Sequence, residues 1–115
     1  SGLQRYVSRF GLAGAKRAFL TARPFSAEQL NAMGLFEALV TPAQWDATLQ
    51  ALVQDILALA PLAVQETKKS LREIETGQAD VARLREREHM TSRSADFAEG
   101  RAAFAERRKP VFVGR

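Results

Sequence analysis

An apolar stripe of five residues constrains this chain more than any other feature of its sequence. The residues are Trp45, Leu49, Leu52, Ile56 and Leu59. They follow one another at steps of four and three, so in an α-helix of 3.6 residues per turn they share one face. Thr41 and Gln44 form a capping box before the stripe, and Pro42 takes the first helical position, where its missing N–H costs nothing. We therefore predict one continuous helix that ends at Pro61.

Capping residues and glycines divide the rest of the chain into further helices. Serine, threonine or aspartate begins a helix by accepting a backbone N–H, and glycine or proline ends one. We predict a helix over residues 3–21 with a break at Phe10 and Gly11, a short helix from the Ser26 and Gln29 capping box to Gly34, and helices over residues 61–77, 80–91 and 94–109. The chain is thus predicted to be mostly helical.

Residues 35–40 are the one good candidate for a β-strand. The segment is short, apolar and bounded by turn signals. A lone strand leaves unpaired amides on both edges, so this segment would need a partner strand from elsewhere. The predicted fold class is therefore mainly α, with at most one short strand at about residues 36–40.

Composition excludes some classes of protein. The chain has 115 residues, the size of one domain, and no cysteine, which excludes disulfides and thiol nucleophiles and fits a cytoplasmic location. The longest apolar stretch, residues 56–64, is too short to cross a bilayer. The net charge of +4 would attract anions, but charges of both signs alternate along residues 83–88, as on a solvated helix face. We expect no membrane partner, and a nucleic-acid partner is unfavoured.

The polar side chains offer no complete catalytic or metal constellation. The single histidine, His89, has no second histidine or cysteine near it, and no zinc-like spacing occurs. Most glutamates, Glu66, Glu73 and Glu99 among them, lie in polar patterns that favour solvated helix faces. We therefore predict no catalytic residue and no metal site in this chain.

Short motifs follow one another along the whole chain in a fixed order. The earlier ones are Gln4-Arg5, Phe19-Leu20-Thr21, Ser26-Ala27, Gly34-Leu35 with Val40 and Pro42, and Leu62-Ala63 with Lys68 or Lys69. The most specific is Ser94-x-Asp96-x-x-Glu99-Gly100-x-x-Ala103-Phe104-x-Glu106-Arg107-Arg108-x-Pro110-x-Phe112-x-Gly114-Arg115. This series resembles the second half of the crotonase (enoyl-CoA hydratase/isomerase) family. Ala22, Phe36 and Arg107 depart from that pattern, which usually has glycine, valine and lysine at these places.

The resemblance implies that residues 1–115 are the C-terminal helical region of a crotonase-like protein, a region for oligomerisation and for the edge of the CoA site. In that family the oxyanion-hole amides and the two glutamates of the hydratases precede the motif matched by Gln4-Arg5. The N-terminal catalytic spiral domain is then expected to be absent from these residues. The resemblance implies no cofactor, with a coenzyme A thioester as the substrate of the whole protein.

The resemblance also implies a ligand site at the end of the chain, formed by Phe104, Arg107 and Arg108. In relatives the C-terminal helix and tail approach the nucleotide end of CoA, and arginine forks onto phosphate well. An alternative is that Arg107, Arg108 and Lys109 are a solvated cluster, stabilised by the negative end of a helix dipole. The family's C-terminal helices also help to build trimers, so a homo-oligomer of that type is expected.

Three functions follow from these observations. In the first, the chain is a C-terminal part of an enoyl-CoA hydratase/isomerase-like enzyme that acts on acyl-CoA thioesters, and this part alone is inactive. In the second, the chain is a standalone, non-catalytic helical interaction module derived from that family. A basic nucleic-acid binder is the third, and it rests on charge alone. The sequence does not distinguish hydratase from isomerase or hydrolase, because residues outside this chain set the reaction.

Overall fold

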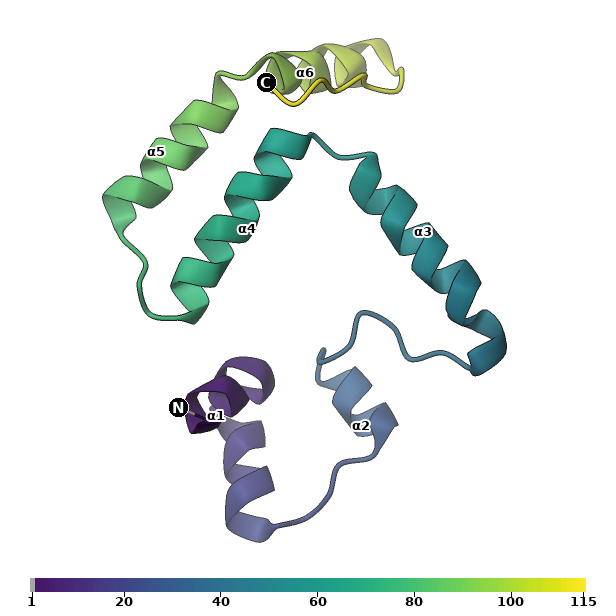
Figure 1. Cartoon of the computed structure of the whole chain (residues 1–115), viewed down its shortest axis with the longest axis vertical. Helices are drawn as coiled ribbons and strands as arrows, with labels where there is room; N and C mark the ends of the chain where they lie inside the picture. The colour runs from purple at the N-terminus through teal and green to yellow at the C-terminus, as the bar shows by residue number, and fades with distance from the viewer. Residues whose placement is uncertain (1) are drawn as a thin grey trace. The chain divides into compact units, whose positions relative to one another are not determined.

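The computed structural model describes residues 2–115 and is helical throughout its regular parts (Figure 1). The elements are α1 (Gly2–Thr21), α2 (Ala27–Ala32), the 3-10 turn η1 (Pro42–Gln44), α3 (Trp45–Leu57), α4 (Pro61–Glu75), α5 (Val81–Ser92) and α6 (Ala95–Glu106). The chain forms two compact units, residues 1–50 and 51–115, with the boundary inside α3. The prediction of a mainly α chain is confirmed.

In the first unit, a kink at Gly11 folds α1 back on itself. Gly11 has φ 68° and ψ 168°, far from helical values. The predicted break at Phe10 and Gly11 is thus confirmed. The kink lets Tyr6, in the first half of α1, pack edge-on against Phe19 in the second half, with ring centroids 4.8 Å apart. Phe10 contacts Phe25 beyond the helix, so a cluster of aromatic rings joins the two halves of α1 to the segment that follows it.

The predicted capping boxes are present. The Gln29 N–H donates to Ser26 Oγ at 3.1 Å, and the Ser26 N–H donates to Gln29 Oε1 at 3.0 Å. The Thr41 N–H donates to Gln44 Oε1 at 3.1 Å. Gly34 adopts the expected left-handed conformation, with φ 76°. These local hydrogen bonds explain why the helix starts were predictable from sequence.

The predicted strand over residues 35–40 is not formed. The segment is a bend followed by irregular backbone, and residues 2–115 contain no β-strand. A strand requires a neighbour that accepts and donates its backbone hydrogen bonds, and the described chain offers none. The short apolar pattern is therefore a connection between α2 and η1.

The apolar stripe forms a helix as predicted, but α3 ends at Leu57 and not at Pro61, so Leu59 lies just beyond it. The helix does not bury the stripe. Trp45 is 60% exposed, and Leu49, Ile56 and Leu59 are also exposed. None of the helices in residues 2–115 is by itself long and apolar enough to span a membrane. The bent pair 42–57 and 61–75 passes that test only jointly, across an angle of 105°.

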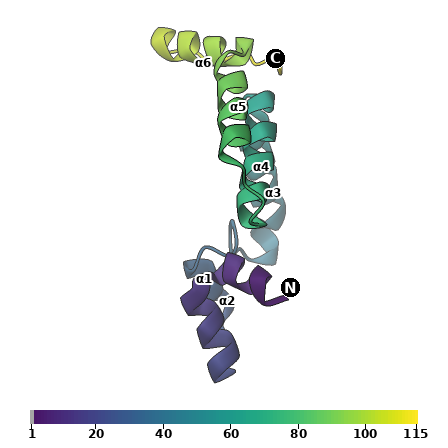
Figure 2. The ribbon, with the colours of Figure 1, turned by 90° about the vertical axis from the view of Figure 1, so that its left-hand side faces the viewer.

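In the second unit, α4 and α5 run side by side in opposite directions (Figures 1 and 2). Gly77 ends α4 in a left-handed conformation with φ 70°, and Asp80 caps α5 by accepting the Arg83 N–H at 2.8 Å. The turn between the two helices is therefore formed by residues that the sequence identifies. It brings the polar side of α4 against the polar side of α5.

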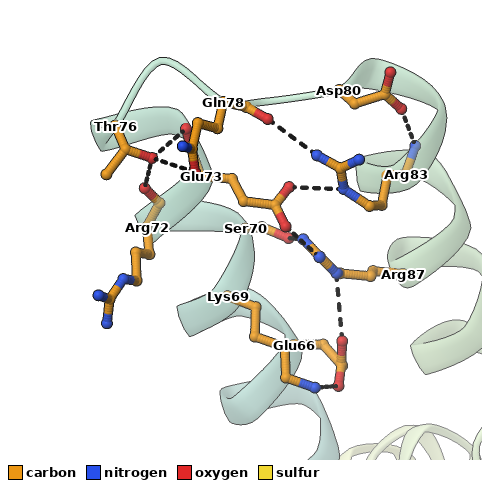
Figure 3. A network of polar contacts seen from close by, with 10 residues as sticks. All are labelled: Glu66, Lys69, Ser70, Arg72, Glu73, Thr76, Gln78, Asp80, Arg83 and Arg87. Atoms are coloured by element: carbon orange, nitrogen blue, oxygen red, sulfur yellow. Dashed lines mark hydrogen bonds and ion pairs between the residues drawn. The ribbon is translucent and has the colours of Figure 1, made fainter.

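Charged side chains join these two helices (Figure 3). Arg87 of α5 pairs with Glu73 and, at 3.5 Å, with Glu66 of α4, while Arg83 contacts Glu73 at 3.1 Å and Lys69 contacts Glu66 at 2.5 Å. The Arg87 hydrogen bond is the main cause of a lowered pKa at Glu73. The prediction that Glu66 and Glu73 are solvated charges is wrong, because both carboxylates lie between the helices and Glu66 is buried.

Candidate functional site

The last helix, α6, starts and ends on well-defined caps. At its start the Phe97 N–H donates to Ser94 Oγ at 3.0 Å. At its end the Arg108 N–H reaches back to the Ala103 carbonyl at 3.0 Å, across a left-handed Arg107 with φ 54°. Glycine usually occupies this position, since a side chain there costs about 1 kcal/mol. Arg107 is therefore held in an unusual conformation at the exposed end of the helix.

Beyond this turn, the C-terminal tail (residues 109–115) runs back along α6 (Figure 1). The carboxylate of Asp96 fixes its far end. Asp96 Oδ1 accepts the Val113 N–H at 2.6 Å, and Oδ2 accepts the Gly114 N–H at 2.8 Å. The Asp96 N–H donates to the Arg115 carbonyl at 3.0 Å, and the aspartate is only 1% exposed. Asp96 thus lies in the first turn of α6, but its main partner is the tail.

Glu99, one turn further along α6, fixes the near end of the tail. Its two oxygens accept from Arg108 at 2.5 and 2.8 Å, and Oε1 also accepts the Val111 N–H at 2.8 Å. The Arg108 fork and then the Val111 amide hold the pKa of Glu99 at about 2. The carboxylate therefore stays charged, and its hydrogen bonds intact, until the pH falls towards that value. The prediction that Glu99 is a plain surface charge is wrong.

Two glycines, Gly100 on α6 and Gly114 in the tail, allow the tail to pack closely against its neighbours. A Cβ on Gly100 would stand 3.7 Å from the Phe112 ring, so the ring lies directly over the helix backbone. A Cβ on Gly114 would stand 3.9 Å from Pro61, the first residue of α4. The tail therefore contacts both α6 and the start of α4.

An open, mostly apolar groove lies beside this tail. Its volume is about 900 Å³. It is lined by Ala60, Ala63, Glu88, Thr91, Ser92, Ser94, Asp96, Phe97, Gly100, Arg101, Phe104, Ala105 and Phe112. Phe104 is 88% exposed, which is unusual for so large an apolar side chain and favours contact with a ligand or another protein surface.

The structure separates the three residues predicted to bind CoA. Phe104 lines the groove, and Arg107 follows at the left-handed turn. Among residues 2–115, no hydrogen bond or ion pair engages the Arg107 guanidinium. Arg108, in contrast, donates from Nη1 and Nη2 to Glu99 and from Nε to Glu106 at 2.6 Å. Neighbours in sequence, the two arginines thus have different surroundings.

Sequence reasoning missed the two carboxylates that hold the tail and the groove residue Arg101. Asp96 and Glu99 are three residues apart, a spacing that places both on one face of α6. Their amide partners, Val111 and Val113, alternate along an extended segment and so face the same way. These two periodicities together were the available signal. The described residues contain no cluster of three or more potential metal ligands.

Comparison with known proteins decides the family. The model of the enoyl-CoA hydratase/isomerase family matches residues 1–115. The chain belongs to this family. The tail motif that holds α6 is therefore a feature of a crotonase-type protein, and the resemblance stated from the sequence is confirmed.

Relatives whose names give different activities match this family member over nearly its whole length. A probable mitochondrial enoyl-CoA hydratase 2 from Arabidopsis thaliana is 32% identical over 98% of the chain. The methylmalonyl-CoA decarboxylase of Escherichia coli K12 is 33% identical over 98%. The crystal structure of an enoyl-CoA hydratase from Mycobacterium tuberculosis H37Rv matches 99% of the chain at 33% identity, with a TM-score of 0.76.

The chain spans less than half of each of these proteins. It covers 38% of the Arabidopsis protein, 45% of the Escherichia coli decarboxylase and 46% of the Mycobacterium tuberculosis chain. This crotonase-family chain is therefore the C-terminal part of the family's fold, and that part is helical.

Proposed function

We propose that this chain supplies one edge of the CoA site, and oligomer contacts, in an enoyl-CoA hydratase/isomerase-family enzyme that acts on acyl-CoA thioesters. The observation that carries the proposal is the end of α6. There an exposed phenylalanine, Phe104, precedes by three residues an arginine, Arg107, whose guanidinium no described residue engages. An exposed apolar ring and an unengaged cation at the same end of one helix suit a ligand with an aromatic base and phosphates.

The names of the relatives support CoA as the shared chemical element. One is named a probable enoyl-CoA hydratase, and another a methylmalonyl-CoA decarboxylase. These names differ in the reaction but not in the CoA carrier. A region that serves the carrier, and not the acyl group, would be compatible with either reaction. We therefore propose CoA recognition for this chain and assign no reaction step to its residues.

Exposed apolar surface supports the second part of the proposal. Trp45, Ile56 and Leu59 on the α3 stripe remain exposed. Contiguous exposed apolar residues favour burial against another protein surface. We propose that this stripe is covered in the assembled enzyme, by a neighbouring subunit of a trimer-type homo-oligomer or by the rest of the enzyme.

Calorimetric titration of the chain with CoA tests the ligand edge. We expect Arg107→Gln to weaken CoA binding by roughly tenfold, the effect of losing one charge-assisted hydrogen bond. Arg85→Gln is the matched control, because it removes the same charge from an exposed site on α5 and should leave CoA affinity unchanged.

Two results would count against CoA recognition. Equal CoA affinities for Arg107→Gln and the unchanged chain would exclude Arg107 as a phosphate contact. A chain that does not bind CoA at all would favour the alternative, a non-catalytic helical interaction module derived from this family.

A further inference from the structure

We infer that Glu99 is a positioning residue for Arg107: it holds the left-handed turn from which the Arg107 side chain would reach the phosphates of CoA. The functional part of this inference rests on the CoA edge proposed above. The geometric part, that Glu99 fixes the turn, stands on the described contacts alone.

Glu99 forms hydrogen bonds with residues that follow Arg107 in the chain. One carboxylate accepts from the Arg108 side chain, at 2.5 and 2.8 Å, and from the Val111 N–H, at 2.8 Å. These groups belong to the residue that directly follows Arg107 and to the residue four positions after it. Glu99 itself lies two turns before, on α6. The carboxylate therefore bridges the helix and the tail across the turn.

The left-handed turn at Arg107 requires stabilising contacts of this kind. Arg107 has φ 54°, a conformation that side-chain-bearing residues rarely adopt. A strained backbone of this kind persists only where surrounding contacts determine it, and such positions concentrate at binding sites. Glycine would relieve the strain. An arginine at this position is explained if its side chain has a task that requires this direction.

The Arg108 guanidinium is already hydrogen-bonded within the chain. Its Nη1 and Nη2 donate to Glu99, and its Nε donates to Glu106 at 2.6 Å. An arginine so engaged acts on a ligand mainly through the backbone that it holds. Changing Arg108 would therefore weaken CoA binding by releasing the turn, whereas changing Arg107 would remove the contact itself.

Glu106 provides a matched control for Glu99. Both are glutamates on α6, and both accept from Arg108. Glu106, however, contacts only Nε, and its side chain is 61% exposed, against 24% for Glu99. Within residues 2–115, Glu106 also makes no hydrogen bond to the tail. Removing Glu106 should therefore leave the fork and the Val111 hydrogen bond in place.

The test compares the ¹⁵N-labelled chain with Glu99→Ala and Glu106→Ala by nuclear magnetic resonance. For Glu99→Ala we expect amide exchange at Val111 to rise by roughly tenfold, and heteronuclear NOE values at Arg107 and Arg108 to fall, while α4 and α5 keep their protection. Glu106→Ala should match the unchanged chain. Arg108→Gln, which keeps the Glu99 contact to Val111, is the second variant and should loosen Arg107 and Arg108 while Val111 stays protected.

CoA titration of the same variants separates this inference from the proposed function. We expect Glu99→Ala to weaken CoA binding about as much as Arg107→Gln, and the double variant to be little weaker than either. An ordered turn in Glu99→Ala, with Val111 as protected as before, would overturn the inference. If the turn loosens in Glu99→Ala but Arg107→Gln leaves CoA affinity unchanged, Glu99 does stabilise the turn. The proposal that Arg107 contacts CoA is then refuted.

Discussion

Asp96→Ala is expected to lower the free energy of unfolding by about 3 kcal/mol, because it removes a buried charged acceptor of two hydrogen bonds. Asp96 is 1% exposed, and its two oxygens accept the N–H groups of Val113 and Gly114. Without the carboxylate, both amides lose their partner at a site that water reaches poorly. Release of the tail would also uncover Phe112 and the face of Gly100 beneath it.

Urea unfolding followed by far-ultraviolet circular dichroism measures this effect. Asp96→Asn should cost less than Asp96→Ala, since the amide retains one acceptor oxygen. Asp55→Ala, at an exposed position of α3, is the control and should change stability by less than about 0.5 kcal/mol. Equal unfolding midpoints for Asp96→Ala and Asp55→Ala would show that the tail is not held as the structure describes.

Gly11→Ala is the second large effect that we expect, at about 2 kcal/mol of lost stability in the first unit. Gly11 has φ 68° and ψ 168°, a region essentially restricted to glycine. No atom lies within 4 Å of a Cβ placed there, so the cost comes from the backbone alone. A chain that avoids this conformation would straighten α1 and separate Tyr6 from Phe19, which now pack at 4.8 Å.

Comparing the thermal unfolding of Gly11→Ala with that of Gly2→Ala measures the stability lost to backbone strain at Gly11. Gly2 also has open space around its Cβ position, but it has no positive φ, so its replacement should be close to neutral. If the two variants unfold at the same temperature, the kink at Gly11 does not require glycine.

The helix boundaries were predictable because local chemistry sets them. A serine, threonine or aspartate cap accepts a backbone N–H three residues later, and a glycine after the last turn ends some of the helices, so these signals act within a few residues of one another. Ser26, Ser94 and Asp80 each accept the amide that the sequence pattern assigns to them. Tertiary contacts are not needed to make these signals readable.

The errors arose where a distant partner decides the outcome. Residues 35–40 have a strand-like pattern but no neighbouring strand in the described chain, so they form an irregular connection. Glu66 and Glu99 look like surface charges until the fold brings Arg87 and Arg108 to them. Pattern reasoning assigns a charged residue to solvent by default, and only the packing of α5 or of the tail supplies the opposite charge.

The candidate site was predictable in part. The family motif identified Phe104, Arg107 and Arg108 as a group, and their role as CoA contacts stays a prediction. Spacing did not indicate that the two arginines would differ, because adjacent residues at a helix end share the same sequence pattern. The left-handed turn at Arg107 and the fork from Glu99 to Arg108 create that difference.

The most direct test of this account is a ¹⁵N resonance titration of the chain with CoA. We predict that the largest shift changes fall on the amides from Gly100 to Arg108 and on Phe112, around the exposed Phe104 ring and the Arg107 turn. Small changes are expected in α1 and α2. Changes confined to α1 and α2, or none at saturating CoA, would contradict the proposal that the end of α6 forms an edge of the CoA site.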